Sequence, residues 1–135
     1  MRIEHVAIYV NNIEVEKNFF VKYFGATAGE KYTNFRNDFT SYFLTFDNGS
    51  RLEIMTRTSS VDPKKDRYRT GYHHIAICVG DRKDVDDMMK KFDADGVIVV
   101  SGARTTGDGY YEAVVVDPEG NEIEIIAEDT QDIRS

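Results

Sequence analysis

The sequence has only one cysteine, Cys78, and fewer basic than acidic residues, 17 Lys and Arg against 24 Asp and Glu. A single cysteine cannot form a disulfide within the chain, which is typical of proteins in a reducing cytoplasm. Since Cys78 lies within an apolar run, we interpret it as a small core or wall residue and not as a nucleophile. The net charge of -7 argues against nucleic acid as a partner, because binding to phosphates requires a basic surface.

Long apolar runs are also missing. No stretch approaches the roughly 20 apolar residues that a membrane-spanning helix requires, and the N-terminus shows no secretory signal pattern. We therefore expect a cytoplasmic protein without a membrane partner. Its 135 residues allow one compact domain, which could consist of two fused halves.

The two halves of the chain repeat one pattern. The segment His5–Val10, HVAIYV, resembles the segment His74–Val79, HIAICV. Further along each half, Glu53 in the run RLEI is answered by Glu124 in the run EIEI. A histidine and a glutamate thus stand at matching points of each half, on apolar runs that resemble strands.

Apolar periodicity predicts one helix and four strands in each half, in the order βαβββ. Asn12 is expected to cap the first helix and Gly25 to end it. The helices are expected near 13–24 and 82–95, and the strands near 2–10, 26–32, 40–46, 51–56, 72–79, 97–100, 110–116 and 122–127. These elements form module 1 (2–56) and module 2 (72–128), which are joined by a polar linker (57–71).

The period-two geometry of strands predicts on which side of its sheet each side chain lies. If the aliphatic residues pack under the helices, four side chains project to the opposite face: His5, Glu53, His74 and Glu124. His73 is expected on the helix side and is left out of the site. Glu122 shares the face of Glu124, and we choose Glu124 because the repeat equates it with Glu53.

These four residues have the chemistry of a divalent metal site. Imidazole nitrogens and carboxylate oxygens are common ligands of such ions. A carboxylate on an apolar strand is also costly unless it is paired or metal-bound. Two neutral imidazoles and two carboxylates balance a divalent cation and leave positions for water or substrate. We therefore expect one divalent ion with these ligands: His5, Glu53, His74 and Glu124.

The chain resembles the vicinal oxygen chelate superfamily, which includes glyoxalase I, bleomycin and fosfomycin resistance proteins, methylmalonyl-CoA epimerase and extradiol dioxygenases. The resemblance extends from Arg2 to about Glu128. It rests on four motifs, namely 4–10 (EHVAIYV), the segment 19–25 with its aromatic residues and Gly25, 74–77 (HIAI) and 117–124 (DPEGNEIE). It implies a single α+β domain over residues 1–135, in which two paired βαβββ modules form an eight-stranded curled sheet. This sheet would make a metal-binding cup with the helices outside.

The ligand order His, Glu, His, Glu is similar to that of glyoxalase I (lactoylglutathione lyase). The resemblance implies a carbon–sulfur lyase or isomerase for a small α-oxo or α-hydroxy compound, such as a thiol hemithioacetal, with a metal-bound enediolate. Glu53 or Glu124 would be the catalytic residue that removes and returns the carbon-bound proton, and the sequence leaves both open. The ion would be Ni, Co or Zn, with Mn and Fe as further alternatives, because His and Glu serve all of them.

Substrate recognition departs from the glutathione-using members of the family. Where these carry an Arg on the first strand and an Asn after the first Glu, this chain has Tyr9 and Thr56-Arg57. Arg104 and Tyr110 are candidate substrate-binding residues in the segment 102–110, which is either a glycine-rich flap or an ordinary hairpin connection. Three further arginines are either an anion grip or surface charges: Arg36, Arg51 and Arg57.

Assembly and function leave alternatives. Family members commonly form homodimers, in some of which one cup combines modules of two chains, and we expect a homodimer with a small-molecule substrate here. Another reaction in the same cup, such as epimerisation or fosfomycin-type thiol transfer, is the second enzymatic alternative. A non-catalytic binding protein of the bleomycin-resistance type is the alternative from another class, and the presence of all four ligands argues against it.

Overall fold

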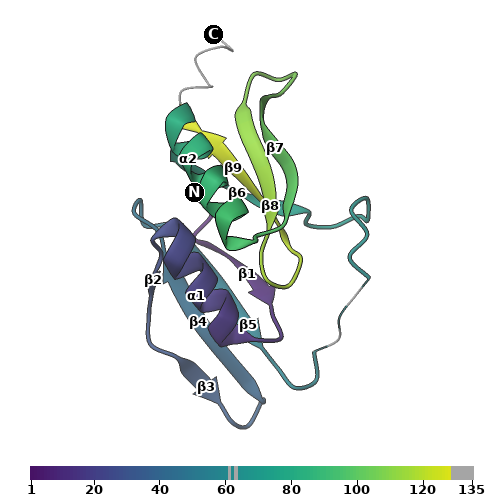
Figure 1. The fold of residues 1–135 in the computed structure, drawn as a ribbon. Helices are drawn as coiled ribbons and strands as arrows, with labels where there is room; N and C mark the ends of the chain where they lie inside the picture. The colour runs from purple at the N-terminus through teal and green to yellow at the C-terminus, as the bar shows by residue number, and fades with distance from the viewer. Residues whose placement is uncertain (61, 63, 129–135) are drawn as a thin grey trace. The chain divides into compact units, whose positions relative to one another are not determined.

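The computed structural model describes residues 1–60, 62 and 64–128. The chain divides into two compact units, Met1–Lys64 and Lys65–Ser135. Each unit contains one helix and one mixed sheet (Figure 1), so the predicted α+β class is confirmed. In the described part of the chain, no helix is both long and apolar enough to cross a membrane.

The first unit combines a five-stranded sheet with one helix. Its elements are β1 (His5–Tyr9), α1 (Ile13–Phe24), β2 (Thr27–Ala28), β3 (Tyr32–Asn34), β4 (Phe39–Thr45) and β5 (Arg51–Thr56). β5 lies between β1, to which it is parallel, and β4, to which it is antiparallel. β4 also pairs with β2 and β3.

The second unit repeats this plan with a four-stranded sheet. Its elements are β6 (His74–Gly80), α2 (Arg82–Asp95), β7 (Val99–Thr105), β8 (Tyr111–Val116) and β9 (Glu122–Ala127). The strand order is β6-β9-β8-β7, with β6 parallel to β9 and the other pairs antiparallel. β9 therefore has the place in the second sheet that β5 has in the first.

Local capping defines both helices, which have the predicted bounds. Asn12 accepts a hydrogen bond from the backbone N–H of Val15 at 3.2 Å, and Asp81 forms a reciprocal capping box with the third residue of α2. Each helix ends at a glycine with a positive φ, Gly25 at 64° and Gly96 at 77°. This left-handed conformation favours glycine because it has no Cβ.

Each helix contributes a phenylalanine to the core of its own unit. Phe20 of α1 is 1 % exposed and Phe92 of α2 is 0 % exposed, and burying such a side chain stabilises the fold by about 1.5–3 kcal/mol. Buried residues of the two sheets complete these cores: Leu44, Leu52 and Ile54 in the first, and Ala113, Val115, Ile123 and Ile125 in the second. The alternate residues of the same strands lie on the opposite face of each sheet, which we call the open face.

Three predicted strands were wrong in extent. The segment 2–10 forms a strand only over His5–Tyr9. The segment 26–32 contributes to two strands, β2 and β3. Three residues lie between Ala28 and Tyr32, whereas only two lie between their partners on β4, and the extra residue interrupts the ladder. β7 continues to Thr105 because it pairs with β8 through register shifts around Ser101, which alternation in the sequence does not reveal. Cys78 is exposed and pairs with Ile126 on the open face, so it lies on the surface of the sheet and not in the core.

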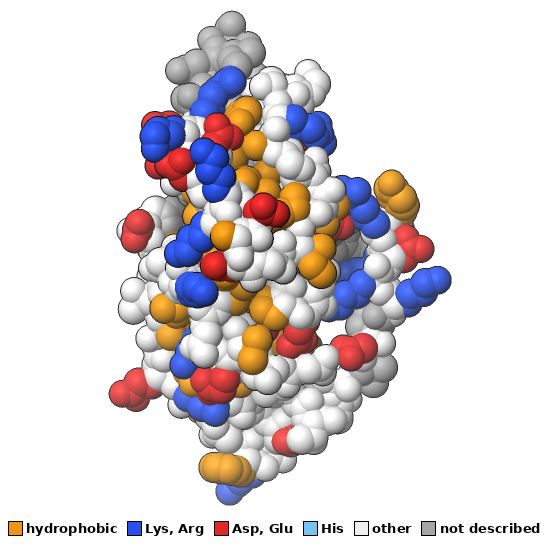
Figure 2. Space-filling view, in the orientation of Figure 1, with side chains coloured by type: hydrophobic (Ala, Val, Ile, Leu, Met, Phe, Trp, Pro, Cys, Tyr) orange, Lys and Arg blue, Asp and Glu red, His pale blue; other side chains and the backbone are white. Residues whose placement is uncertain are grey.

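The charged residues surround these cores. Figure 2 shows acidic and basic side chains interspersed over the face that it draws. This mixture agrees with the modest net negative charge of the sequence.

Candidate metal centre

A histidine and a glutamate meet on the open face of the first unit. In the parallel pair of β1 and β5, His5 is opposite Arg51 and Ala7 is opposite Glu53, so His5 and Glu53 are diagonal neighbours on the same face. His5 Nε2 lies 3.7 Å from Glu53 Oε1. The side chain of Glu53 is 16 % exposed and that of His5 is 38 % exposed, so both remain within reach of a small ligand.

The second unit builds the same pair in the same register. In the parallel pair of β6 and β9, His74 is opposite Glu122 and Ala76 is opposite Glu124. His74 Nε2 lies 3.0 Å from Glu124 Oε2. The structure therefore brings the predicted residues together as two equivalent His–Glu pairs, one in each unit.

These pairs fit part of a metal coordination shell. A neutral imidazole and a carboxylate that bind neighbouring positions of a six-coordinate ion, with bonds of about 2.1 Å, are separated by about 3.0 Å. The His74–Glu124 separation has this value, and the His5–Glu53 separation is wider. Among residues 1–60, 62 and 64–128, no three such side chains gather as a metal site. Each unit therefore offers two donors, fewer than the three or four protein ligands that zinc-like sites use.

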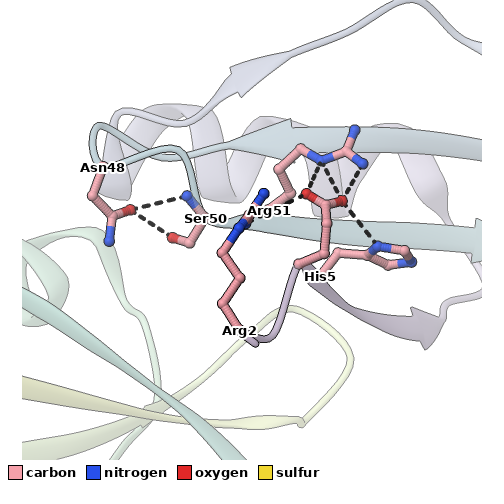
Figure 3. Close-up of polar contacts among 6 residues, drawn as sticks. Arg2, His5, Asn48, Ser50 and Arg51 are labelled. Carbon is pink, nitrogen blue, oxygen red and sulfur yellow. Dashed lines mark hydrogen bonds and ion pairs between the residues drawn. The ribbon is translucent and has the colours of Figure 1, made fainter.

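The surroundings of His5 are charged and aromatic. Its Nδ1 lies 3.2 Å from Oε1 of Glu4, and Arg51 donates to the same carboxylate, with Nε 3.0 Å from Oε1 (Figure 3). The hydrogen bond from Arg51, followed by those from His5, lowers the pKa of Glu4 against the opposing effect of burial. The ring of Phe43 meets His5 edge-on at 5.1 Å, while the Arg51 guanidinium lies 4.0 Å above that ring. His5 is thus held on two sides.

The surroundings of His74 differ, and they correct the prediction for His73. His73 precedes β6, so strand alternation does not apply to it, and its side chain does not join the helix side. Its Nδ1 lies 2.7 Å from Nδ1 of His74, and its Nε2 lies 3.4 Å from Oε2 of Glu122. Arg67 Nε lies 3.4 Å from Oε1 of the same glutamate, an atom that is buried and makes no hydrogen bond.

Sequence reasoning missed one carboxyl group of the site, Glu112 on β8. Val114 is directly opposite Glu124 in the β8–β9 ladder, so Glu112 lies diagonally beside Glu124 on the open face. Burial, then the hydrogen bond with Glu124 and the charge of Glu124, raise the pKa of Glu112 to about 7, while Arg104 opposes the shift. The period-two pattern of β8 placed Glu112 on this face, but only the register with β9 shows which residue it meets.

The predicted substrate residues lie on and after β7. Arg104 is opposite Glu112 in the ladder and donates from Nε to the hydroxyl of Ser101 at 3.1 Å. The backbone of Tyr110 exchanges hydrogen bonds with Thr106, which closes a short turn before β8. The segment 102–110 consists of the end of β7 and the turn that leads to β8, since its first four residues belong to β7.

A pocket of about 490 Å³ adjoins Glu53 in the first unit. Aromatic rings and one further carboxylate dominate its lining: Gly29, Glu30, Tyr32, Phe39, Ser41, Phe43 and Glu53. Arg57 lies next to this lining, with its guanidinium 5.2 Å from the ring centre of Phe39. It donates to the Tyr9 hydroxyl at 2.9 Å and to the Asn37 carbonyl at 2.7 Å. The pocket offers an apolar space next to one of the candidate ligands.

The comparisons with known proteins agree with this architecture. The chain belongs to the Glyoxalase/Bleomycin resistance protein/Dioxygenase superfamily, whose family model matches residues 2–125. It is similar to the uncharacterized protein YqjT of Bacillus subtilis (strain 168), with 25 % identity over 134 residues that cover 93 % of this chain and 98 % of that protein.

Solved structures share the fold at lower identity. The trypanothione-dependent glyoxalase I of Leishmania major is 23 % identical with a TM-score of 0.81, and the match covers 99 % of this chain and 91 % of that chain. Lactoylglutathione lyase from Agrobacterium tumefaciens is 20 % identical with a TM-score of 0.66, with coverages of 94 % and 93 %. These likenesses establish the fold alone.

Proposed function

We propose that this chain is a metal-dependent lyase or isomerase similar to glyoxalase I. It would act on a small α-oxo or α-hydroxy compound, such as a thiol hemithioacetal. The observation that carries the proposal is the pair of equivalent His–Glu contacts, His5 with Glu53 and His74 with Glu124, in identical register on parallel strands. A binding protein without metal chemistry has no need to place the same two donor types twice.

One divalent ion would take two ligands from each unit, whether the two units belong to one chain or to two copies in a homodimer. Its ligands would be His5, Glu53, His74 and Glu124. Ni, Co and Zn suit this donor set best, with Mn and Fe as alternatives. When bound, such an ion polarises a carbonyl or hydroxyl oxygen of the substrate and stabilises the negative charge that develops there.

We further propose a cytoplasmic location.

Glu53 is the better placed of the two candidate bases. It lines the pocket beside Phe43, so a substrate in that space presents its carbon-bound proton to the Glu53 carboxylate. Glu124 shares a hydrogen bond with Glu112, which engages part of its basic lone-pair density. We therefore assign proton removal and return to Glu53 and a purely ligating role to Glu124.

The remaining contacts suggest how substrate is held. The aromatic lining of the pocket, including Tyr32 and Phe39, favours an apolar part of the substrate. Arg104 shares a ladder position with Glu112 and is proposed to bind an anionic or carbonyl group of the substrate. Tyr110, next to the turn, is proposed as a second contact.

Turnover of hemithioacetals formed from 2-oxoaldehydes and various thiols, glutathione among them, tests the proposal. Glu53→Gln should lower kcat by a factor of about 100 or more, because general base catalysis contributes about that much. Glu124→Gln should chiefly weaken metal binding, with partial recovery of turnover at high metal concentration. Glu128→Gln, an exposed residue outside both pairs, is the matched control and should leave kcat unchanged. Full turnover in both Glu53→Gln and Glu124→Gln would contradict the mechanism.

The alternative of a non-catalytic binder predicts a different outcome. The pocket beside Glu53 favours this second candidate because it would hold an apolar ligand without any metal. In that case Glu53→Gln would keep the affinity for the ligand, and no hemithioacetal would be turned over by the wild-type protein.

A further inference from the structure

The pocket beside Glu53 has a small polar residue at its bottom. Ser41 lines this pocket and is only 3 % exposed. It is opposite Tyr32 in the β3–β4 ladder, and Phe39 and Phe43 are its neighbours on the same face of β4, because alternate residues of a strand share a face. The pocket is therefore deepest where a small side chain stands among large aromatic rings.

The hydroxyl of Ser41 has an apolar surrounding. Within residues 1–60, 62 and 64–128, no side-chain hydrogen bond to this hydroxyl is found. Burial of a hydroxyl without a hydrogen-bond partner is costly. Since a hydroxyl both donates and accepts, a ligand with an oxygen atom that reaches Ser41 would remove this cost, whereas a purely apolar ligand would not.

Ser41 lies at a defined distance from the proposed base. Glu53 is opposite Phe43 in the β4–β5 ladder, and Ser41 is two residues from Phe43 along the strand, which corresponds to about 7 Å. A phenyl ring with an oxygen atom at its far end bridges a separation of this order between the reacting carbon and that oxygen. Such a ring can also contact Tyr32, Phe39 and Phe43 in the offset or edge-on arrangements that aromatic pairs prefer.

We propose that Ser41 is a specificity-determining residue, which selects α-oxo substrates that carry an aryl ring with a hydroxyl group at its far end. The ring would occupy the aromatic pocket, and its hydroxyl would form a hydrogen bond with that of Ser41. A site that binds a substrate hydroxyl in this way discriminates against an analogue without it, since its own polar group is then left unpaired. The inference rests on the proposed function for the reaction of this substrate, whereas recognition of the ring belongs to the first unit alone.

Binding of 4-methylphenol and 1,4-dimethylbenzene to the metal-free full-length protein tests this recognition without turnover. The two probes have nearly the same shape and differ by a hydroxyl in place of a methyl group. Ser41→Ala should weaken binding of 4-methylphenol by a factor of about 5 or more, and 1,4-dimethylbenzene should bind equally well or better. NMR titration measures both affinities and shows whether the probes contact β3 and β4.

Three further variants separate Ser41 from its neighbours. Thr40→Ala removes a hydroxyl from the opposite face of the same strand and should change neither affinity. Glu30→Gln alters an exposed carboxylate of the pocket and should leave the ratio of the two affinities unchanged. Ser41→Val fills the hollow and should weaken binding of both probes.

The affinity ratio of the two probes decides the proposal. A ratio that Ser41→Ala leaves unchanged would overturn it, and so would a shift caused by Glu30→Gln in its place. Probes that do not contact β3 and β4 in the wild type, or that bind Ser41→Val as well as the wild type, would also overturn it.

Turnover separates this proposal from the proposed function. In the metal-loaded protein, hemithioacetals of 4-hydroxyphenylglyoxal and 4-methylphenylglyoxal should show the same change in their ratio of kcat/KM when Ser41 is replaced by alanine. An affinity ratio that depends on Ser41, in a protein that turns over no hemithioacetal, would uphold the proposal and refute the proposed function. Turnover with ratios that Ser41→Ala leaves unchanged would do the reverse.

Discussion

The two units of this protein place the same chemistry in unequal surroundings. Both set a histidine on the outer strand of a parallel pair and a glutamate two register positions further on the neighbouring strand. In the first unit an apolar pocket adjoins the glutamate, whereas in the second unit a further carboxyl group, Glu112, does so. The repeat thus preserves the two candidate donor types while their neighbours differ. In the proposed mechanism both pairs would hold the ion, and only the pair of the first unit would also face the substrate.

Each unit has a core in which one helix packs on its sheet. Substitutions that leave a cavity in these two cores have the largest expected effect. Phe20→Ala and Phe92→Ala should each lower the free energy of unfolding by about 3–5 kcal/mol, because both leave a cavity in a closed core. Urea denaturation measures the loss. Phe35→Ala is the matched control, since Phe35 is 92 % exposed, and should change stability by less than about 0.5 kcal/mol. A small effect of either core substitution would show that the two halves are not equivalent in packing.

The carboxyl pair of the second unit, Glu112 and Glu124, should make the stability of the metal-free protein depend on pH. The pKa of Glu112 is raised from 4.5 to about 7, so the folded protein holds this proton more tightly than the unfolded chain does. Stability of the metal-free protein should therefore fall as the pH rises from about 4.5 to about 7. Glu112→Gln removes this loss and should be more stable than wild type above pH 7 by about 1 kcal/mol, since solvent screening of this half-buried carboxyl group reduces the full effect of the shift.

Thermal unfolding of both proteins across this pH range measures the difference. Glu128→Gln serves as the control for loss of one carboxylate, and it should follow the wild-type curve in shape. A constant offset between Glu112→Gln and wild type at every pH would show that Glu112 has an ordinary pKa.

The first unit contains a carboxylate with the opposite behaviour, and it gives the smallest effect. Hydrogen bonds from Tyr42 at 2.8 Å and then from Lys17 and Lys31 lower the pKa of Glu14 from 4.5 to about 2. Its stabilising contribution is present above about pH 4.5 and is lost as the pH falls towards 2. Because Glu14 is 45 % exposed, solvent screening limits the contribution to about 0.5 kcal/mol.

Glu14→Gln should accordingly be less stable than wild type at pH 7 and equal to it near pH 2. Comparison of the two unfolding curves at these pH values is the measurement. The reverse order, with the variant less stable only in acid, would contradict the assignment of Glu14 as a carboxylate held ionised.

The sequence predicts those features that are decided locally. Both helices have the expected bounds because Asn12, Gly25 and Gly96 fix their ends within one turn. The faces of β1, β5, β6 and β9 follow from alternation, so the common face of each histidine and glutamate was predictable, whereas their contact depends on the register of the paired strands.

The features that alternation could not predict depend on partners distant in sequence. His73 stands just before β6, and only its contacts with His74 and Glu122 show where it lies. Glu112 becomes part of the site through the register of β8 against β9. The extent of β7 depends on pairing with a register shift, which has no counterpart in the local pattern.

The central claim is that both His–Glu pairs serve a single metal ion. Calorimetric titration of metal-stripped protein with Ni²⁺, alongside His5→Ala and His74→Ala, tests it most directly. The account predicts one ion per chain in the wild type and severe loss of binding in either variant, since each removes a ligand of the same ion. Two ions per chain, with one retained in each variant, or no binding by the wild-type protein, would contradict it.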